Sequence, residues 1–150
     1  MEPFRHILVA TAFDDGSKRA LDLALLLAAQ SAARLTILHV TEPPPQAFAM
    51  YSEGMSWPSD ELHEHASKQL GVLVEEATKK YWRITGLVAP GVPWEIIRET
   101  SRYDSIDLVV MGTHGRRGMN RLFLGSVAEK VVRTALVSVL TVPLHSAAEA

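Results

Sequence analysis

The chain has 150 residues, a formal charge of −2, an apolar content of 47% and a charged content of 21%. These values are ordinary for one globular domain with a sizeable core, here expected to span residues 1–150. The absence of cysteine excludes a disulfide scaffold, a thiol nucleophile and a thiolate metal site. No signal pattern and no apolar run of about 20 residues occurs, so no membrane association is expected and the cytoplasm is the expected location. The slightly negative charge gives no reason to expect nucleic acid as a partner.

Apolar runs and helical patterns alternate along the chain. The runs predict strands over residues 6–13, 34–40, 82–89, 107–111 and 136–142, as expected for strands buried on both faces of a parallel sheet. Apolar residues at helical spacing predict helices over 19–33, 59–81, a stretch that follows Pro93, and 126–135. The alternation predicts an α/β fold, a doubly wound five-stranded parallel sheet with four helices on its two faces.

Two segments fall outside this alternation. Residues 41–58 contain three successive prolines, two methionines and three aromatic residues, and are expected to form a long loop. A connection of this length is uncommon, and it predicts a flap over a site or a partner surface, with a mobile surface excursion as the alternative. The tail, residues 145–150, is expected to be frayed.

The most informative stretch is the loop that follows the strand ending at Met111 and enters a helix at Ser126. It holds four of the nine glycines and three arginines: Gly112, Gly115, Gly118, Gly125, Arg116, Arg117 and Arg121. Glycine lets a ligand approach backbone N–H groups closely. A helix N-terminus favours an anion, and guanidinium groups suit phosphate. The stretch therefore predicts a phosphate-binding site.

The spacing of these glycines narrows the prediction. The chain contains no Gly-x4-Gly-Lys-Ser/Thr motif, and the dinucleotide fingerprint is missing after the first strand. The observed pattern is Gly112-x2-Gly115, nine residues, then Gly125-Ser126. It resembles the ATP-binding branch of the universal stress protein family. Residues 6–11, 38–40 and 125–130 resemble the same family, so the resemblance covers nearly the whole chain.

The resemblance implies strand order 3-2-1-4-5 and an ATP site where the first and fourth strands end. Ligands of such sheets bind where the strand order reverses, which agrees with that position. Amide groups at Gly112, Gly125 and Val127 are expected to contact the phosphates, while Ala10 and Val40 form walls for adenine. The expected site residues are Ala10, Thr11, Ala12, Val40, Met111, Gly112, His114, Gly115, Arg116, Gly125, Ser126 and Val127.

Several of these residues also have a purely structural interpretation. Ser126 and Glu129 fit a capping box, which is the favoured role of the pair, and the Ser126 hydroxyl can contact phosphate as well. His114 is expected to be a surface donor and not an acid or base. Asp14 and Asp15 are expected first of all to start a helix. A magnesium or manganese ion held between these carboxylates and the phosphates is the second possibility.

The sequence departs from the family at one position that bears on the base. The family carries an aspartate directly after the threonine that ends the first strand, and this chain has Ala12 there. A missing acceptor predicts weaker discrimination in favour of the adenine amino group. A second departure, at residues 136–138, concerns the entry to a strand and not the pocket.

The last predicted strand bears on assembly. Residues 136–142 are strongly apolar and lie at the sheet edge in the expected order, which invites pairing with another chain. The family dimerises through this strand, so a homodimer is expected.

The expected function is that of a dimeric stress-response module that binds ATP. Neither a catalytic triad, nor paired carboxylates, nor a phosphate-binding lysine motif is identifiable in the sequence, so we expect at most slow hydrolysis. An unidentified regulatory protein partner is also expected. The alternative is a nucleotide-free adaptor of the same fold. A hydrolase or transferase that uses His114 and a metal is a third, weaker hypothesis.

Overall fold

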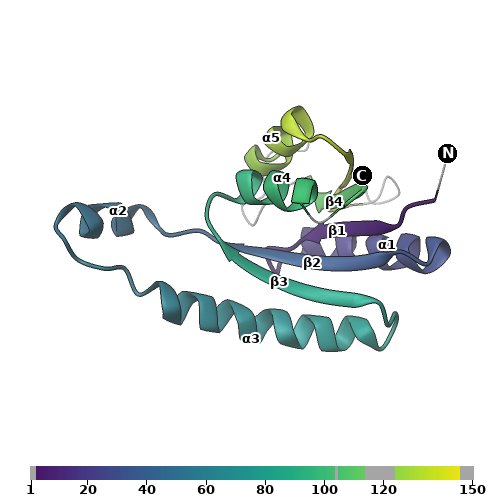
Figure 1. Ribbon diagram of the computed structural model, residues 1–150, viewed down its shortest axis with the longest axis horizontal. Coiled ribbons are helices and arrows are strands. Elements are labelled where there is room, and N and C mark those ends of the chain that lie inside the picture. Colours follow the sequence, from purple (N-terminus) through teal and green to yellow (C-terminus); the bar gives the residue numbers. More distant parts are fainter. Residues whose placement is uncertain (1–2, 104, 114–123, 146–150) are drawn as a thin grey trace.

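The computed structural model describes residues 3–103, 105–113 and 124–145 (Figure 1). Strands and helices alternate along it, apart from two successive helices between β2 and β3. The elements are β1 (His6–Ala10), α1 (Asp15–Ser31), β2 (Arg34–Thr41), α2 (Pro45–Ser52), α3 (Ser59–Thr78), β3 (Ile84–Pro90), α4 (Pro93–Tyr103), β4 (Leu108–Gly112), α5 (Ser126–Thr134) and β5 (Ser138–Val142).

The five strands form one parallel sheet in the order β3-β2-β1-β4-β5, which confirms the predicted topology. Helices α1 and α3 pack on one face, and α4 and α5 pack on the other (Figure 1). No helix in the described part of the chain combines the length and apolar character that crossing a membrane requires.

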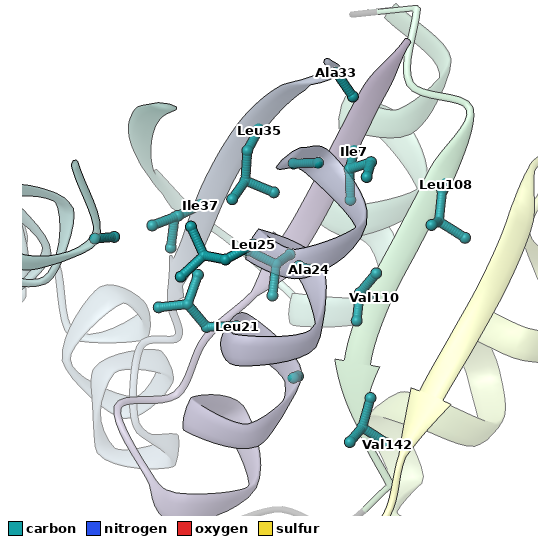
Figure 2. Close-up of a cluster of buried hydrophobic side chains, with 14 of the residues drawn as sticks. Ile7, Leu21, Ala24, Leu25, Ala33, Leu35, Ile37, Leu108, Val110 and Val142 are labelled. Atoms are coloured by element: carbon teal, nitrogen blue, oxygen red, sulfur yellow. The ribbon is translucent and has the colours of Figure 1, made fainter. Parts of the chain in front are cut away.

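Alternate residues of the central strands supply the two halves of the core. Ile7 and Val9 face α1 and are fully buried. Figure 2 shows Ile7 beside Leu21, Ala24 and Leu25 of that helix. Leu8, between Ile7 and Val9, faces α4 and α5 and is equally buried. This alternation within continuous apolar runs is what a sheet covered on both faces requires.

The chain reverses its winding between β1 and β4. From β1 it passes to α1 on one face, and from β4 it leads toward α5 on the other. At this point Gly112 lies directly against the first turn of α1. A Cβ atom at Gly112 would lie 3.2 Å from the carbonyl carbon of Gly16 and 3.3 Å from its oxygen. The missing side chain of Gly112 therefore has a packing function, whatever else the residue does.

Residues 41–58 were predicted to be a loop, and they contain the helix α2, so the described residues hold five helices where four were predicted. Pro45 occupies a first-turn position, where the missing N–H costs nothing. Ala47 is fully buried, whereas Phe48 and Tyr51 are 68% and 49% exposed. The segment projects from the carboxyl end of β2, away from the sheet (Figure 1).

The prediction for the first helix was right about its cap and wrong about its boundary. The carboxylate of Asp14 accepts a 2.9 Å hydrogen bond from the amide of Ser17, so α1 begins at Asp15, before the predicted Arg19. The strand before it ends at Ala10, before the predicted Phe13, because Phe13 has a φ of +58° and leaves the extended conformation.

Substitution of Gly112 by alanine tests the contact with α1. We expect Gly112→Ala to lower the free energy of unfolding by about 1–3 kcal/mol, because backbone atoms of α1 must move to admit the methyl group. Gly71→Ala is the matched control, since open space surrounds that position inside α3, and it should raise stability by about 0.5–1 kcal/mol. Urea denaturation of both variants measures the difference. If the two substitutions changed the free energy of unfolding equally, the contact between Gly112 and α1 would be unimportant for stability.

Candidate functional site

A cleft opens at the carboxyl ends of β1 and β4, with about 750 Å³ of empty volume when the solvent at its mouth is included. Nine of the twelve predicted site residues line it. They are Ala10, Thr11, Ala12, Val40, Met111, Gly112, Gly125, Ser126 and Val127. The other three, His114, Gly115 and Arg116, lie outside the described residues. The sequence prediction thus identifies residues that the fold brings together from three strands and the start of α5.

The turn after β1 forms one wall of the cleft and is held by its own hydrogen bonds. The amide of Thr11 donates to the carbonyl of Leu38 at 2.9 Å, and the amide of Phe13 donates to Thr11 Oγ1 at 3.0 Å. The amide of Ala12 donates to Ser17 Oγ at 2.9 Å. These bonds fix a turn in which Phe13 adopts a left-handed conformation that is unusual for a bulky residue.

His39 braces this turn from β2, a role that the sequence analysis missed. Its Nδ1 atom lies 2.7 Å from the carbonyl oxygen of Thr11, and its ring centroid lies 4.4 Å from that of Phe13. Because a carbonyl oxygen accepts only, Nδ1 carries the proton. No local signal reveals this role, since the partner lies 28 residues away in the sequence.

The opposite wall is the start of α5. Gly125 is the N-cap, and its amide donates to the carbonyl of Thr113 at 2.6 Å. The next three amides, those of Ser126, Val127 and Ala128, have no acceptor among the described residues. The first amides of a helix lack intrahelical partners, so here they are available to a ligand.

The predicted capping box is wrong. Ser126 is the first residue of α5 and not its cap, and the cap position carries no side-chain hydrogen bond. Glu129 lies one position too far along for a capping box, and its carboxylate binds Arg133 on the next turn. With glycine at the N-cap, no described side chain satisfies the first amides of α5.

The electrostatics of the cleft therefore differ between the starts of α1 and α5. The carboxylate of Asp14 caps α1 and offsets the partial positive charge at that end. At the start of α5 the N-cap residue Gly125 offers no carboxylate, and the first-turn carboxylate of Glu129 is paired with Arg133, so the partial positive charge there is offset less. Asp14 is the only carboxylate, and no lysine or arginine is present, among the described residues that line the cleft. An anion is thus favoured at α5.

The floor of the cleft is apolar. Met111 and Val40 were predicted, whereas Leu38, Pro93 and Ile97 were not. The last two come from the start of α4, which the sequence identified as a helix without relating it to the site. Within the described ranges, no three histidine, aspartate or glutamate side chains gather in a way that could hold a metal ion. The arrangement therefore suits a ligand with a planar apolar part and an anionic part.

Comparisons with known proteins show to which family this chain is similar. Residues 3–143 match the family model described as the universal stress protein family. A curated universal stress protein of Thermus aquaticus is 32% identical over 145 residues, covering 93% of this chain and 98% of the relative.

Solved structures show the same fold. The structure of protein MJ0577, from Methanocaldococcus jannaschii, superposes with a TM-score of 0.83 at 23% identity, covering 97% of this chain and 99% of its own. A universal stress protein solved in complex with cAMP superposes with a TM-score of 0.65 at 25% identity, covering 95% of this chain and 99% of its own.

Proposed function

The chain belongs to the universal stress protein family, and from that premise we propose that it binds ATP in the cleft between β1, β4 and α5. The observation that carries the proposal is the uncapped start of α5, which presents free amides to a cleft with an apolar floor. The structural neighbour solved with cAMP supports an adenine nucleotide as the ligand.

The phosphates would lie at α5. Three successive amides and the partial charge of the helix can bind phosphate oxygens, as helix N-termini commonly do. The hydroxyl of Ser126, which does not serve as a cap, is free to add a further donor. Of the residues outside the described ranges, Gly115 and one of the loop arginines would complete this end of the site. A divalent cation would find a single described carboxylate in the cleft, that of Asp14.

The adenine ring would lie between Ala10 and Val40, over the apolar floor. Few polar groups remain to select the base there. The Thr11 carbonyl already accepts from His39, and the Ala12 amide already donates to Ser17. Because the Ala12 side chain offers no acceptor, we expect the phosphates to contribute more to affinity than the identity of the base.

The protein would act as a binding module, with at most slow hydrolysis. The described part of the cleft provides neither a lysine on the phosphates nor a base paired with a second carboxylate. A nucleotide-free adaptor is the second candidate, and the exposed Phe48 and Tyr51 on α2 favour it. Mass spectrometry of gently purified protein distinguishes the two functions. Bound ATP supports the binding module. Protein that is empty and gives no calorimetric signal with ATP supports the adaptor.

The start of α5 can be tested by removing one amide. We expect Ser126→Pro to weaken ATP binding about tenfold or more, because it deletes a charge-assisted hydrogen bond. The fold should tolerate it, since proline suits the first helical position and Gly125 has φ −59° and ψ 157°, as the residue before a proline requires. Isothermal titration calorimetry measures the affinity.

Ser126→Ala is the control for that experiment. It removes only the hydroxyl and leaves the amide, so its affinity should fall less than that of Ser126→Pro. If both variants bound ATP as the original chain does, phosphate contact at α5 would be refuted.

Base selection can be tested at Ala12. We expect Ala12→Asp to raise the ratio of ATP to GTP affinity roughly tenfold, because a carboxylate accepts from the adenine amino group and repels the guanine oxygen. The added charge weakens both nucleotides alike, so the ratio is the quantity to measure. Ala12→Asn should change the ratio less, since an amide can serve either base. An unchanged ratio in Ala12→Asp would place the base elsewhere.

We also propose a homodimer through the sheet edge at residues 136–142, where β5 pairs with a single strand, β4, among the described residues. Analytical ultracentrifugation should give twice the chain mass. Leu136→Lys should weaken the dimer, because it places a charge beside that edge. Val72→Lys on α3 is the matched control, since the two side chains are 65% and 64% exposed. A monomer, or equal effects of the two changes, would contradict the proposal.

A further inference from the structure

A second depression lies at the other end of the sheet, at the amino ends of β1, β2 and β3. Its empty volume is about 580 Å³, with open solvent included. Six residues line it: His6, Arg34, Trp82, Arg83, Ile84 and Thr85. None of them belongs to the cleft at the carboxyl ends.

The floor of this depression is polar, because His6 and Thr85 line it, and Thr36 on β2 links these two side chains. His6 and Thr36 are each 6% exposed, and His6 Nε2 lies 2.8 Å from Thr36 Oγ1. Thr36 Oγ1 in turn lies 3.3 Å from Thr85 Oγ1, so one chain of polar contacts crosses three strands. Gly86 faces α3, so Thr85 lies on the face of β3 that α3 leaves open. The buried side chains of His6 and Thr36 are thus connected to Thr85, on the face of β3 that α3 does not cover.

Two guanidinium groups stand beside that floor. Leu35 pairs with Ile84, which brings the preceding residues, Arg34 and Arg83, to the same level of the sheet. Arg34 makes no side-chain hydrogen bond or ion pair within the described chain. Arg83 uses one nitrogen on the carbonyl of Ala32, at 2.5 Å, and keeps its other N–H donors.

Within the described residues, no ion pair joins either guanidinium group to a carboxylate. Both oxygens of Asp107 accept backbone amides, from Arg5 at 2.7 Å and from His6 at 3.2 Å. The guanidinium groups are therefore left to a ligand, and a guanidinium with free N–H groups binds a planar or tetrahedral oxyanion by paired hydrogen bonds.

An aromatic surface completes the depression. Trp82 is 76% exposed, and the guanidinium carbon of Arg83 lies 5.5 Å from its ring centroid. The Arg83 guanidinium lies over one face of the indole, and much of the remaining ring surface is exposed to water. A second aromatic ring can stack on that exposed surface. A stacking surface next to paired donors is suited to a ligand that has an aromatic ring and an anionic group close together.

We propose that this depression binds a small molecule that carries a phosphate monoester on or next to an aromatic ring. Arg34 and Arg83 bind the phosphate oxygens, and Trp82 stacks on the ring. The site is independent of the nucleotide cleft, because the two share no lining residue in the part of the chain that the structure describes.

Titration of the full chain with phenyl phosphate tests the proposal. The indole N–H signal of Trp82, assigned by its loss in Trp82→Phe, should shift and saturate in two-dimensional NMR spectra. Inorganic phosphate alone and phenol alone should each bind at least fivefold more weakly, because each fills half of the site. The variant Ser126→Pro should bind phenyl phosphate as the original chain does, which separates this site from the cleft.

Arg34→Gln should weaken phenyl phosphate at least fivefold, and Arg34→Lys should weaken it less, since the charge is kept and the planar fork is lost. Arg102→Gln is the matched control, because the Arg102 guanidinium also lies beside an exposed aromatic ring, that of Tyr103, at 5.8 Å. No shift at Trp82, or equal affinity in Arg34→Gln and the original chain, would overturn the proposal. An affinity lowered equally by Arg102→Gln would also overturn it.

Discussion

The close contact between Gly112 and the first turn of α1 is the constraint on which the cleft depends. Strands β1 and β4 are neighbours, yet the chain continues to opposite faces of the sheet after each of them. The starts of α1 and α5 therefore meet at one point, and the absent side chain of Gly112 lets α1 come close. The Asp14 carboxylate accepts a hydrogen bond from an amide at the start of α1. Gly125 makes no side-chain cap hydrogen bond at the start of α5. The proposed anion site rests on that difference in capping.

The wall opposite α5 is built in a different way, from hydrogen bonds that the protein makes to itself. His39 and Ser17 hold the turn after β1 in a conformation that includes the left-handed Phe13. A wall that is fixed before binding loses little freedom when a ligand arrives. The polar groups of this wall already hydrogen-bond within the protein. The wall therefore offers the ring of a ligand mainly shape and apolar surface. This division places the donors at one end of the cleft and the apolar contact at the other.

The alternation of strands and helices and the glycine-rich loop after the fourth strand could be predicted because they depend on local patterns, whereas the strand order was implied by the family resemblance. Buried parallel strands read as apolar runs, and the loop that follows the fourth of them is rich in glycine. The helix α2 was missed because three prolines dominate its start. The role of His39 was missed because its partner, Thr11, is distant in sequence. The cap of α5 was misplaced by one residue, since Ser126 looks like a cap and Gly125 serves as one.

The two ends of the sheet offer a ligand different hydrogen-bond donors, because the helices pack differently at each end. At the carboxyl ends, helices on both faces bring apolar side chains and helix starts together, so backbone amides are the available donors. At the amino ends of β2 and β3, α3 packs on one face and leaves the other to Thr36 and Thr85. Donors there come from side chains, chiefly Arg34. A glycine-rich pattern reveals the first kind of site in a sequence. The second kind depends on the register that sets Arg34 beside Arg83, and it becomes visible only in the folded chain.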